Sequence, residues 1–334
     1  MAHTVMEISE PEHPRYFHGT LLAEIESPVQ SWKVLATEEF GEMLFIDGQH
    51  QSSLKDEHLY HEMLVHSVMH SAAEGARVLV LGGSEGSLIR EILKWPQVAQ
   101  VQQVDWDASL CSYFQSAERA HWNQGAYQNP KVALHIGEAQ AFLESLEEET
   151  TYDTIFVDLL DPTEENLNFC KKILSLAKAH LKGAGSLIVN AGYVSRGQRT
   201  PAADLATFMK EQFQEPQFHR VALQQFIPSF FGEWCFLAAV PRTWCSGIHE
   251  MNLPSGLCWF TKAVLLDATR WSEDYPAEIR NFWIPTPEER SLSTVSAVVT
   301  GAGAGAGSDA AEPIEKLREV EDPWECKVFE HYGC

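Results

Sequence analysis

Apolar and polar residues alternate between about residues 19 and 53, and turn-forming pairs interrupt the alternation. Alternation with a period of two residues is typical of β-strands that bury one face. The pairs Phe40-Gly41 and Asp47-Gly48 fall between the alternating runs, where tight turns are expected. This pattern predicts a small antiparallel β-sheet near the N-terminus.

A helical pattern follows at residues 56–70, with acids in its first turn and Leu59, Met63 and Val68 on one side. Beyond it, apolar runs alternate with helical or loop sequence, which predicts a parallel sheet with helices on both faces. Two later runs lie close enough to form an antiparallel pair at the edge of that sheet. The runs are residues 77–81, 101–105, 132–136, 154–158, 186–190, 221–227 and 234–240.

The composition changes past about residue 287. The stretch "SLSTVSAVVTGAGAGAGSDAAEP" is rich in small residues that bury little apolar surface, which indicates a flexible linker. A short helix is expected in the segment that follows it. We therefore predict a β domain with a connecting helix at residues 1–73, a larger α/β domain at 74–286, and a linker and tail at 287–334.

The overall composition is that of a soluble globular protein, with 45% hydrophobic and 21% charged residues among 334. Lys and Arg number 24 against 47 Asp and Glu, so the formal net charge is -23 at pH 7. Such a chain repels nucleic acid and anionic membranes, and we expect it to bind neither. The charge suits a cationic ligand, but acidity that only confers solubility explains it equally well.

The cysteines and the N-terminal segment bear on the compartment. Seven cysteines without a Cys-x-x-Cys pair favour reduced thiols in an intracellular protein. The segment "MAHTVMEISEPEHPRYF" has acids and prolines where a signal peptide needs an apolar core. No run reaches the roughly 18 apolar residues of a membrane span. We expect a soluble, cytoplasmic protein.

The stretch "VLVLGGSEGSLIREIL" is an apolar run followed by a glycine-rich turn and a helical pattern. Gly82, Gly83 and Gly86 would let the backbone turn tightly and approach a ligand closely, although a purely structural turn explains them as well. Glu85 lies where a phosphate-binding loop would receive its anion. We therefore expect this loop to face a cation.

Two acids at strand ends favour a nucleoside. Asp105 ends the second strand of the larger sheet, 19 residues after Gly86, a spacing at which an acid commonly binds both ribose hydroxyls. No Lys or Arg follows closely to bind a pyrophosphate or 2′-phosphate, which favours an S-adenosyl compound over NAD(P). Glu138 follows the third strand. It either accepts a hydrogen bond from an adenine amino group or only stabilises the positive N-terminal end of the next helix.

The sequence "TIFVDLLDP" places Asp158 and Asp161 at the end of the fourth strand, opposite Glu85. Crowded like charges are costly unless a cation enters, so these carboxylates predict an acidic pocket for a positively charged ligand. A turn that starts at Asp161-Pro162 would explain Asp161 but not Asp158.

The histidines of "HLYHEMLVHSVMH" do not predict a metal site. The pattern H-E-x-x-H places two histidines four residues apart on one helical face, whereas His61 and His66 are five apart. His66 and His70 have the right spacing but no evident third ligand. No metal is expected.

In this order, "FGEMLFIDGQHQSSLKDEHLYHEMLVH", "VLGGSEGSLIRE", "VDWD", "VDLLDP" and "FIPSFFGEW" resemble the polyamine aminopropyltransferases of the spermidine synthase family. The resemblance covers about residues 30–240. The loop "GGSEGS", with "YHE" and "IPSFFGEW", is more similar to thermospermine synthases and to bacterial triamine or agmatine aminopropyltransferases than to animal spermidine synthases.

The resemblance implies a Rossmann-like α/β fold, as in class I methyltransferases, with a seven-stranded sheet and a small N-terminal antiparallel β domain. It implies decarboxylated S-adenosylmethionine as co-substrate, no other cofactor, and a homodimer or homotetramer. Asp105 would bind the ribose, Glu138 and Ala139 the adenine, and Glu85 the ammonium of the donor. The donor site as a whole would comprise Gln30, Gln51, Gly82, Gly83, Glu85, Asp105, Glu138 and Ala139.

For the acceptor, the resemblance implies that Asp158, helped by Tyr60, orients and deprotonates the attacking amine. Asp161 and Glu85 would hold the remaining ammoniums. The motif "FIPSFFGEW" would contribute three further contacts, from Phe230, Glu233 and Trp234.

Three residues depart from the family pattern. Phe230 replaces a tyrosine that spermidine synthases use for putrescine, which favours spermidine as acceptor and spermine or thermospermine as product. Ser84 stands where a third glycine is usual, and Glu138 where aspartate is usual. Two alternatives stay open, a class I methyltransferase and a catalytically silent polyamine-binding protein.

Overall fold

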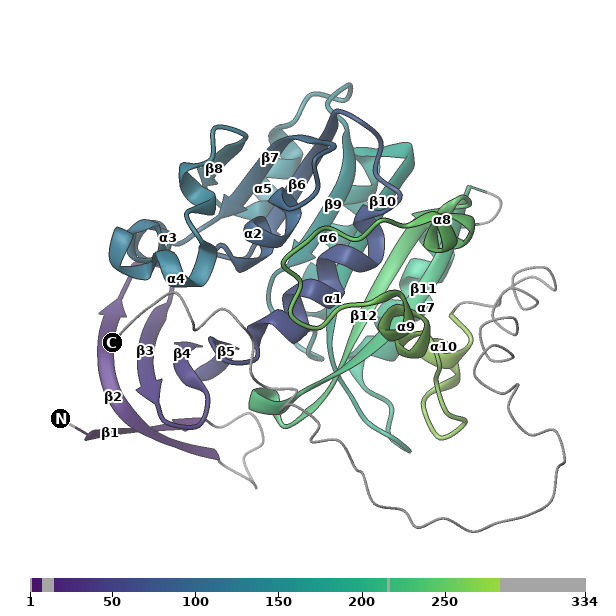
Figure 1. Cartoon of the computed structure of the whole chain (residues 1–334). Coiled ribbons are helices and arrows are strands. Elements are labelled where there is room, and N and C mark those ends of the chain that lie inside the picture. The colour runs from purple at the N-terminus through teal and green to yellow at the C-terminus, as the bar shows by residue number, and fades with distance from the viewer. Residues whose placement is uncertain (1, 8–14, 215–216, 283–334) are drawn as a thin grey trace, which may run out of the picture. The chain divides into compact units, whose positions relative to one another are not determined.

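The computed structural model describes residues 2–7, 15–214 and 217–282 (Figure 1). Its N-terminal part is an antiparallel sheet in which each strand pairs with the next along the chain, as the alternating pattern predicts. The turn between the last two strands has positive φ angles at Asp47 (49°) and Gly48 (78°), as tight hairpin turns require. The strands are β1 (Ala2–Glu7), β2 (Arg15–Glu26), β3 (Ser31–Thr37), β4 (Gly41–Ile46) and β5 (Gln49–Ser53).

The second sheet has seven strands in the order β11-β12-β10-β9-β6-β7-β8. Strands β6 to β10 are parallel to one another, and β12 joins β10 and β11 in antiparallel pairs, so the predicted edge pair is confirmed. The strands are β6 (Ala76–Gly82), β7 (Val98–Asp105), β8 (Val132–Ile136), β9 (Tyr152–Asp158), β10 (Leu181–Val194), β11 (Phe218–Ile227) and β12 (Gly232–Pro241).

Helices cover both faces of the second sheet (Figure 1). Val78 and Val80 of β6 pack in one core cluster with α1, α2, α8 and α9, and Leu79 and Leu81 pack in another with α5, α6, α7 and α10. The α-helices are α1 (Glu57–Met69), α2 (Ser87–Leu93), α3 (Ala108–Gln115), α4 (Ala120–Asn123), α5 (Ala139–Ser145), α6 (Leu167–Ala179), α7 (Pro201–Gln212), α8 (Trp244–Glu250), α9 (Lys262–Ala268) and α10 (Ala277–Arg280). Short 3₁₀ helices are η1 (Ala117–Arg119), η2 (Ala126–Gln128) and η3 (Pro228–Phe230).

Helix α1 differs from its sequence pattern, which shows apolar residues on one side. All its residues except His58 are buried, because α2 and strands β10 to β12 enclose it. Its buried polar groups are bonded: Glu62 accepts from the backbone N–H groups of Cys258, Trp259 and Phe260, and His66 bonds to Glu91. The helix that carries Tyr60 is therefore fixed on all sides.

The small sheet shares a core cluster with helices α3 and α4. Trp32, Val34 and Leu44 from the small sheet pack against Leu110, Phe114 and Trp122 of the larger part.

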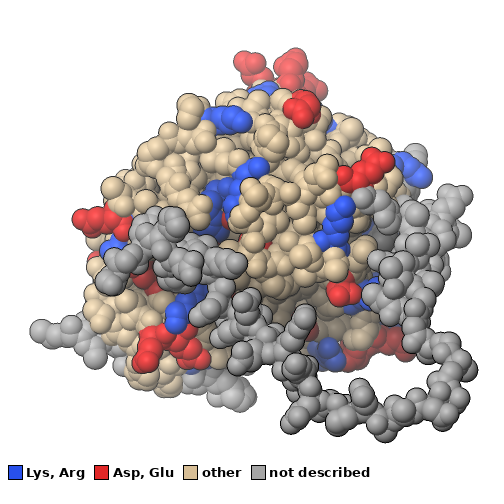
Figure 2. Space-filling view, in the orientation of Figure 1, with Lys and Arg blue, Asp and Glu red and all other residues tan. Residues whose placement is uncertain are grey.

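The domain boundaries at residues 73 and 286 stay a prediction, and residues 287–334 lie outside the described residues. Among the residues that the structure describes, none of the helices combines the length and the apolar character that a membrane span needs. On the face in Figure 2, acidic and basic side chains are interspersed rather than gathered in one patch.

Candidate active site

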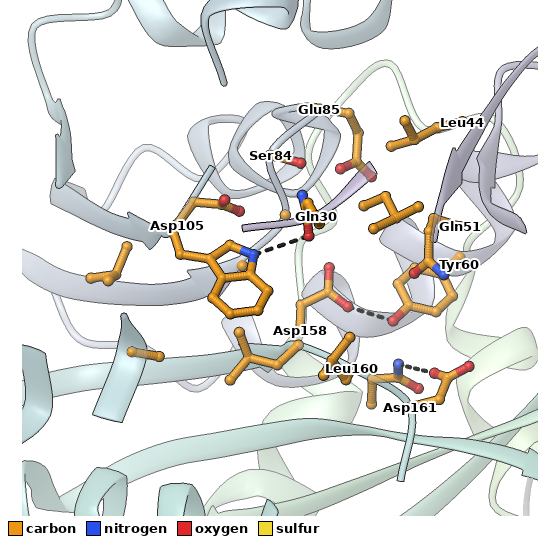
Figure 3. A pocket seen from close by; sticks show the side chains of 18 of the residues that line it. Gln30, Leu44, Gln51, Tyr60, Ser84, Glu85, Asp105, Asp158, Leu160 and Asp161 are labelled. Carbon is orange, nitrogen blue, oxygen red and sulfur yellow. Dashed lines mark hydrogen bonds between the residues drawn. The ribbon is translucent and has the colours of Figure 1, made fainter. Parts of the chain in front are cut away.

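A cavity of about 290 Å³ opens at the carboxyl ends of β6 to β9, where the small sheet lies against them (Figure 3). Ligands in open parallel sheets collect at this edge. Glu233 does not line the cavity; it lies on β12, paired with Phe226 and Val194. The other predicted site residues line it together: Gln30, Gln51, Tyr60, Gly82, Gly83, Glu85, Asp105, Glu138, Ala139, Asp158, Asp161, Phe230 and Trp234.

The glycine-rich loop brings β6 and β9 into close contact. Gly82 has a φ of 90° and pairs with Asp158, and a Cβ atom at position 82 would lie 1.9 Å from the Asp158 carbonyl oxygen. Only glycine fits there. Ser84 does not have a positive φ, so this departure from the family pattern leaves the loop unstrained.

Asp158 and Tyr60 form the central pair of the cavity (Figure 3). The Tyr60 hydroxyl donates to Oδ1 of Asp158 at 2.5 Å. Burial raises the pKa of Asp158 to about 7, and the charges of Glu85 and Asp161 act in the same direction, while the His61 charge and the Tyr60 hydrogen bond oppose it. Burial and the Asp158 charge hold the pKa of Tyr60 well above its usual value, so its proton stays in place. A carboxyl with a pKa near neutrality is suited to accept a proton.

Asp161 lies beside this pair and is oriented by two partners. Asn190 donates its side-chain N–H to Oδ1 of Asp161 at 2.6 Å, and Trp234 also hydrogen-bonds to the carboxylate. Burial raises the pKa of Asp161, although both hydrogen bonds oppose the shift. Sequence reasoning missed Asn190, yet its place at the end of the predicted strand 186–190 marks it as a residue of the binding edge.

Glu85 is paired inside the protein. Nε2 of His61 lies 3.1 Å from Glu85, and Nδ1 lies 2.7 Å from Glu57, which also pairs with Arg90. Burial alone would lower the pKa of His61, but the hydrogen bonds and charges of the two glutamates raise it to about 10. His61 is therefore an imidazolium at neutral pH. The sequence showed His61 only as a rejected metal ligand; its spacing of four residues from Glu57 was the available signal.

The end of the cavity near β7 and β8 holds the predicted nucleoside residues. Burial raises the pKa of Asp105 to about 6, with a smaller contribution in the same direction from the Glu85 charge. Glu138 precedes α5 but makes no capping hydrogen bond with its side chain, so the carboxylate is available to a ligand. Trp106 also lines this end, and its place directly after Asp105 in "VDWD" was the available signal.

The loop that carries Phe230 is tied to the start of α1. Ser229 donates to both carboxylate oxygens of Asp56, from its backbone N–H at 2.7 Å and from its hydroxyl at 2.9 Å. Phe230 packs on Trp234 with ring centroids 4.5 Å apart and on Tyr60 at 6.1 Å. The rings of Phe230 and Trp234 form an aromatic wall of the cavity. Helix α1 carries Tyr60, and the residue at its start, Asp56, holds the loop of Phe230.

In the described residues, no three His, Cys, Asp or Glu side chains are arranged to hold a metal ion. The arrangement offers a buried carboxyl with a nearly neutral pKa, Asp158, in a cavity whose other end carries the acids Asp105 and Glu138. Acidic side chains and the absence of Lys and Arg among the lining residues favour cationic ligands.

Comparison with known proteins agrees with this geometry. Residues 57–242 match the spermine/spermidine synthase domain family. A polyamine aminopropyltransferase of Saccharolobus islandicus is 32% identical over 254 residues, 73% of this chain and 81% of that protein. One of Oceanobacillus iheyensis is 33% identical over 246 residues, 72% of this chain and 45% of that protein.

Two solved structures have the same fold. Spermidine synthase from Thermotoga maritima superposes with a TM-score of 0.68 at 16% identity, covering 84% of this chain and 93% of that one. A spermidine synthase in complex with the transition state analogue AdoDATO gives a TM-score of 0.71 at 17% identity, covering 84% and 94%. From these matches and the acidic cavity at the sheet edge, the chain belongs to the spermine/spermidine synthase family and is an aminopropyltransferase.

Proposed function

We propose that the protein transfers an aminopropyl group from decarboxylated S-adenosylmethionine to spermidine, giving spermine or thermospermine and releasing 5′-methylthioadenosine. The observation that carries the proposal is the convergence of Glu85, Asp158 and Asp161 on one cavity that also holds Asp105. The resemblance of the motifs to thermospermine synthases supports this choice of product class.

Charge supports a polyamine acceptor. Five acidic side chains line the cavity, and His61 balances only one of their charges. The chain of a polyamine consists of ammonium groups joined by methylenes, which match carboxylates and aromatic faces in turn. The Phe230 and Trp234 rings provide the apolar wall beside Asp161.

Proton transfer is the step that the enzyme has to solve. An amine with a pKa near 10.4 is mostly protonated at pH 7, so about three pKa units, or about 4 kcal/mol, separate it from its reactive form. Asp158 takes a proton from the attacking ammonium. The nitrogen lone pair then forms a bond to the carbon next to the sulfonium, and the C–S bond breaks with its electrons moving to sulfur. The acceptor gains a secondary amine and methylthioadenosine leaves.

Phe230 supports the longer acceptor. It offers no hydroxyl to bind the second ammonium of a short diamine, and it is buried against His50 and Trp234. A triamine can instead place its far ammonium beyond the aromatic wall. Asp161, held by Asn190, would fix the register of the chain and hence the nitrogen that attacks.

Product analysis tests the proposal. The protein is incubated with decarboxylated S-adenosylmethionine and, separately, putrescine, spermidine, norspermidine or agmatine, with chromatography that separates spermine from thermospermine. We expect spermidine to react fastest. Preference for putrescine or agmatine would overturn the acceptor, methylated products from S-adenosylmethionine alone would indicate a methyltransferase, and polyamine binding without any methylthioadenosine would indicate a silent binding protein.

We further propose a homodimer or homotetramer in solution, because the motifs resemble a family of oligomeric enzymes. Light scattering of the purified protein tests this directly. A monomeric mass over the concentration range of the activity assay would contradict it.

A further inference from the structure

The turn between β11 and β12 carries an aromatic residue in an unfavourable backbone conformation. Phe231 has a φ of 56°, in the left-handed region that bulky residues rarely adopt. Its ring is 53% exposed and does not line the cavity. A strained residue persists only where its surroundings hold it, and such residues gather at functional sites. The reaction steps above do not use Phe231.

The small sheet holds this ring. Phe231 packs on Phe17 with ring centroids 6.3 Å apart and on Phe40 at 5.8 Å. The guanidinium of Arg15 lies over the ring, 5.2 Å from its centroid, and its charge adds to the apolar contacts. These partners come from β2 and from the turn before β4. The tip of the β11–β12 turn is therefore docked on the small sheet, beside β5 (Figure 1).

The backbone next to Phe231 is tied at two places. Arg15 donates from Nη1 to the carbonyl oxygen of Phe230 at 2.8 Å. One residue earlier, Ser229 donates to both carboxylate oxygens of Asp56. The backbone of Phe230 is thus held from the small sheet on one side and from the start of α1 on the other. Its ring cannot shift unless one of these contacts breaks.

The ring of Phe230 carries this docking into the cavity. It is buried, lines the cavity, and packs against Trp234 and His50 with centroids 4.5 Å and 5.0 Å away. A shift of the ring would change the width of the acceptor end and the apolar surface that the methylenes of an amine cover. Contacts outside a pocket that lock its wall in place preserve its selectivity.

We propose that Phe231 is a positioning residue for acceptor selection: together with Arg15 it docks the β11–β12 turn on the small sheet and so fixes the ring of Phe230 at the acceptor end of the cavity. This inference rests on the proposed function, since it concerns the choice among acceptors of the same reaction.

Steady-state kinetics with spermidine and with putrescine test the role of Phe231. Phe231→Ala should lower the ratio of the kcat/KM for spermidine to that for putrescine by about threefold to tenfold, the size expected from losing one or two ring contacts. The KM for decarboxylated S-adenosylmethionine should stay that of wild type. Phe231→Tyr keeps the ring and should restore the wild-type ratio.

Phe226→Ala is the matched control. Its ring is 54% exposed, lies on β11 of the same hairpin, and does not line the cavity. This variant should keep the acceptor ratio of wild type. An unchanged ratio in Phe231→Ala would overturn the proposal. So would an equal rise in the KM values of donor and acceptor, because the residue would then act on the whole cavity.

Glycine at position 231 separates placement of the ring from stability. Phe231→Gly relieves the backbone strain, because glycine adopts positive φ freely, so it should withstand urea better than Phe231→Ala. Both variants lack the aromatic ring and should lose the preference for spermidine equally. A preference that recovers along with stability in Phe231→Gly would mean that the ring serves stability alone, and would overturn the proposal.

A double-mutant cycle tests the joint action of Arg15 and Phe231. Arg15→Met removes the bond to Phe230 and the charge over the ring, and should lower the acceptor ratio in the wild-type background. In the Phe231→Ala background its effect should be smaller, because both residues act through one turn. Equal effects in the two backgrounds would overturn their joint role. If wild type forms no methylthioadenosine with any amine, the proposed function itself fails; turnover with unchanged selectivity in Phe231→Ala overturns only the present inference.

Discussion

The hydroxyl of Tyr60 lies 2.5 Å from a carboxylate oxygen of Asp158, although α1 and β9 are far apart in the sequence. Burial holds the pKa of this carboxyl at about 7, and the hydrogen bond from Tyr60 limits how far it rises. The pair thus combines a base of nearly neutral pKa with a neutral donor that orients it. The first two predictions follow from this relationship.

Asp158→Asn should reduce kcat by about a hundredfold to ten-thousandfold, the range typical of losing a general base, because an amide cannot take the proton of the attacking ammonium. The asparagine side chain has the same size as that of aspartate, so the affinity for methylthioadenosine should stay close to that of wild type. Single-turnover kinetics and calorimetry measure the two quantities. An Asp158→Asn enzyme with normal turnover would remove this residue from the mechanism.

Tyr60→Phe should move the pH profile of kcat/KM toward alkaline pH. With Asp158 as the proposed base, activity requires its ionised form, so the rate of wild type should rise with pH through about 7. The Tyr60 hydrogen bond favours the ionised form, and without it the pKa of Asp158 rises further. The variant should therefore lose most activity at pH 7 and regain much of it at higher pH. A uniform loss at every pH would show that Tyr60 acts in another way.

The strands and their ends could be predicted from the sequence because apolar runs and following acids are local patterns. Asp105 and Asp158 both end the strands on which they were expected. The pairing of His61 with Glu85 could not be predicted, because it depends on how α1 packs against the glycine-rich loop. Glu233 shows that a motif match is not enough to place a residue in the site, since it belongs to the matching motif "FIPSFFGEW" but does not line the cavity.

His61 should make the stability of the protein fall at alkaline pH. Its pKa is raised from 6.5 to about 10 in the folded state, so the stabilisation is complete below pH 6.5 and is lost as pH rises through 10. His61→Gln leaves buried Glu85 without its cation, whereas Glu57 keeps Arg90, and should cost about 3 to 5 kcal/mol at pH 7. Urea unfolding at pH 7, 8.5 and about 10 would measure both effects, with a smaller alkaline loss in the variant.

His50→Gln is the matched control for this measurement. Burial lowers the pKa of His50 to about 3, so this histidine is neutral throughout the alkaline range. The free energy of unfolding of His50→Gln should fall at alkaline pH as steeply as that of wild type, whatever its absolute value. If His61→Gln also kept that slope, His61 would not be charged in the folded protein.

Gly82→Ala should disrupt both stability and catalysis. A Cβ atom there would lie 1.9 Å from the carbonyl oxygen of Asp158, so β6 and β9 would have to separate at the proposed catalytic residue. We expect a loss of roughly 4 kcal/mol or more in urea unfolding, together with loss of methylthioadenosine formation. Gly75 has a positive φ of 75° with no atom within 4 Å of an added Cβ, so Gly75→Ala carries backbone strain of about 1 kcal/mol and no clash. Equal costs for the two variants would mean that φ alone, and not the contact with Asp158, requires glycine at position 82.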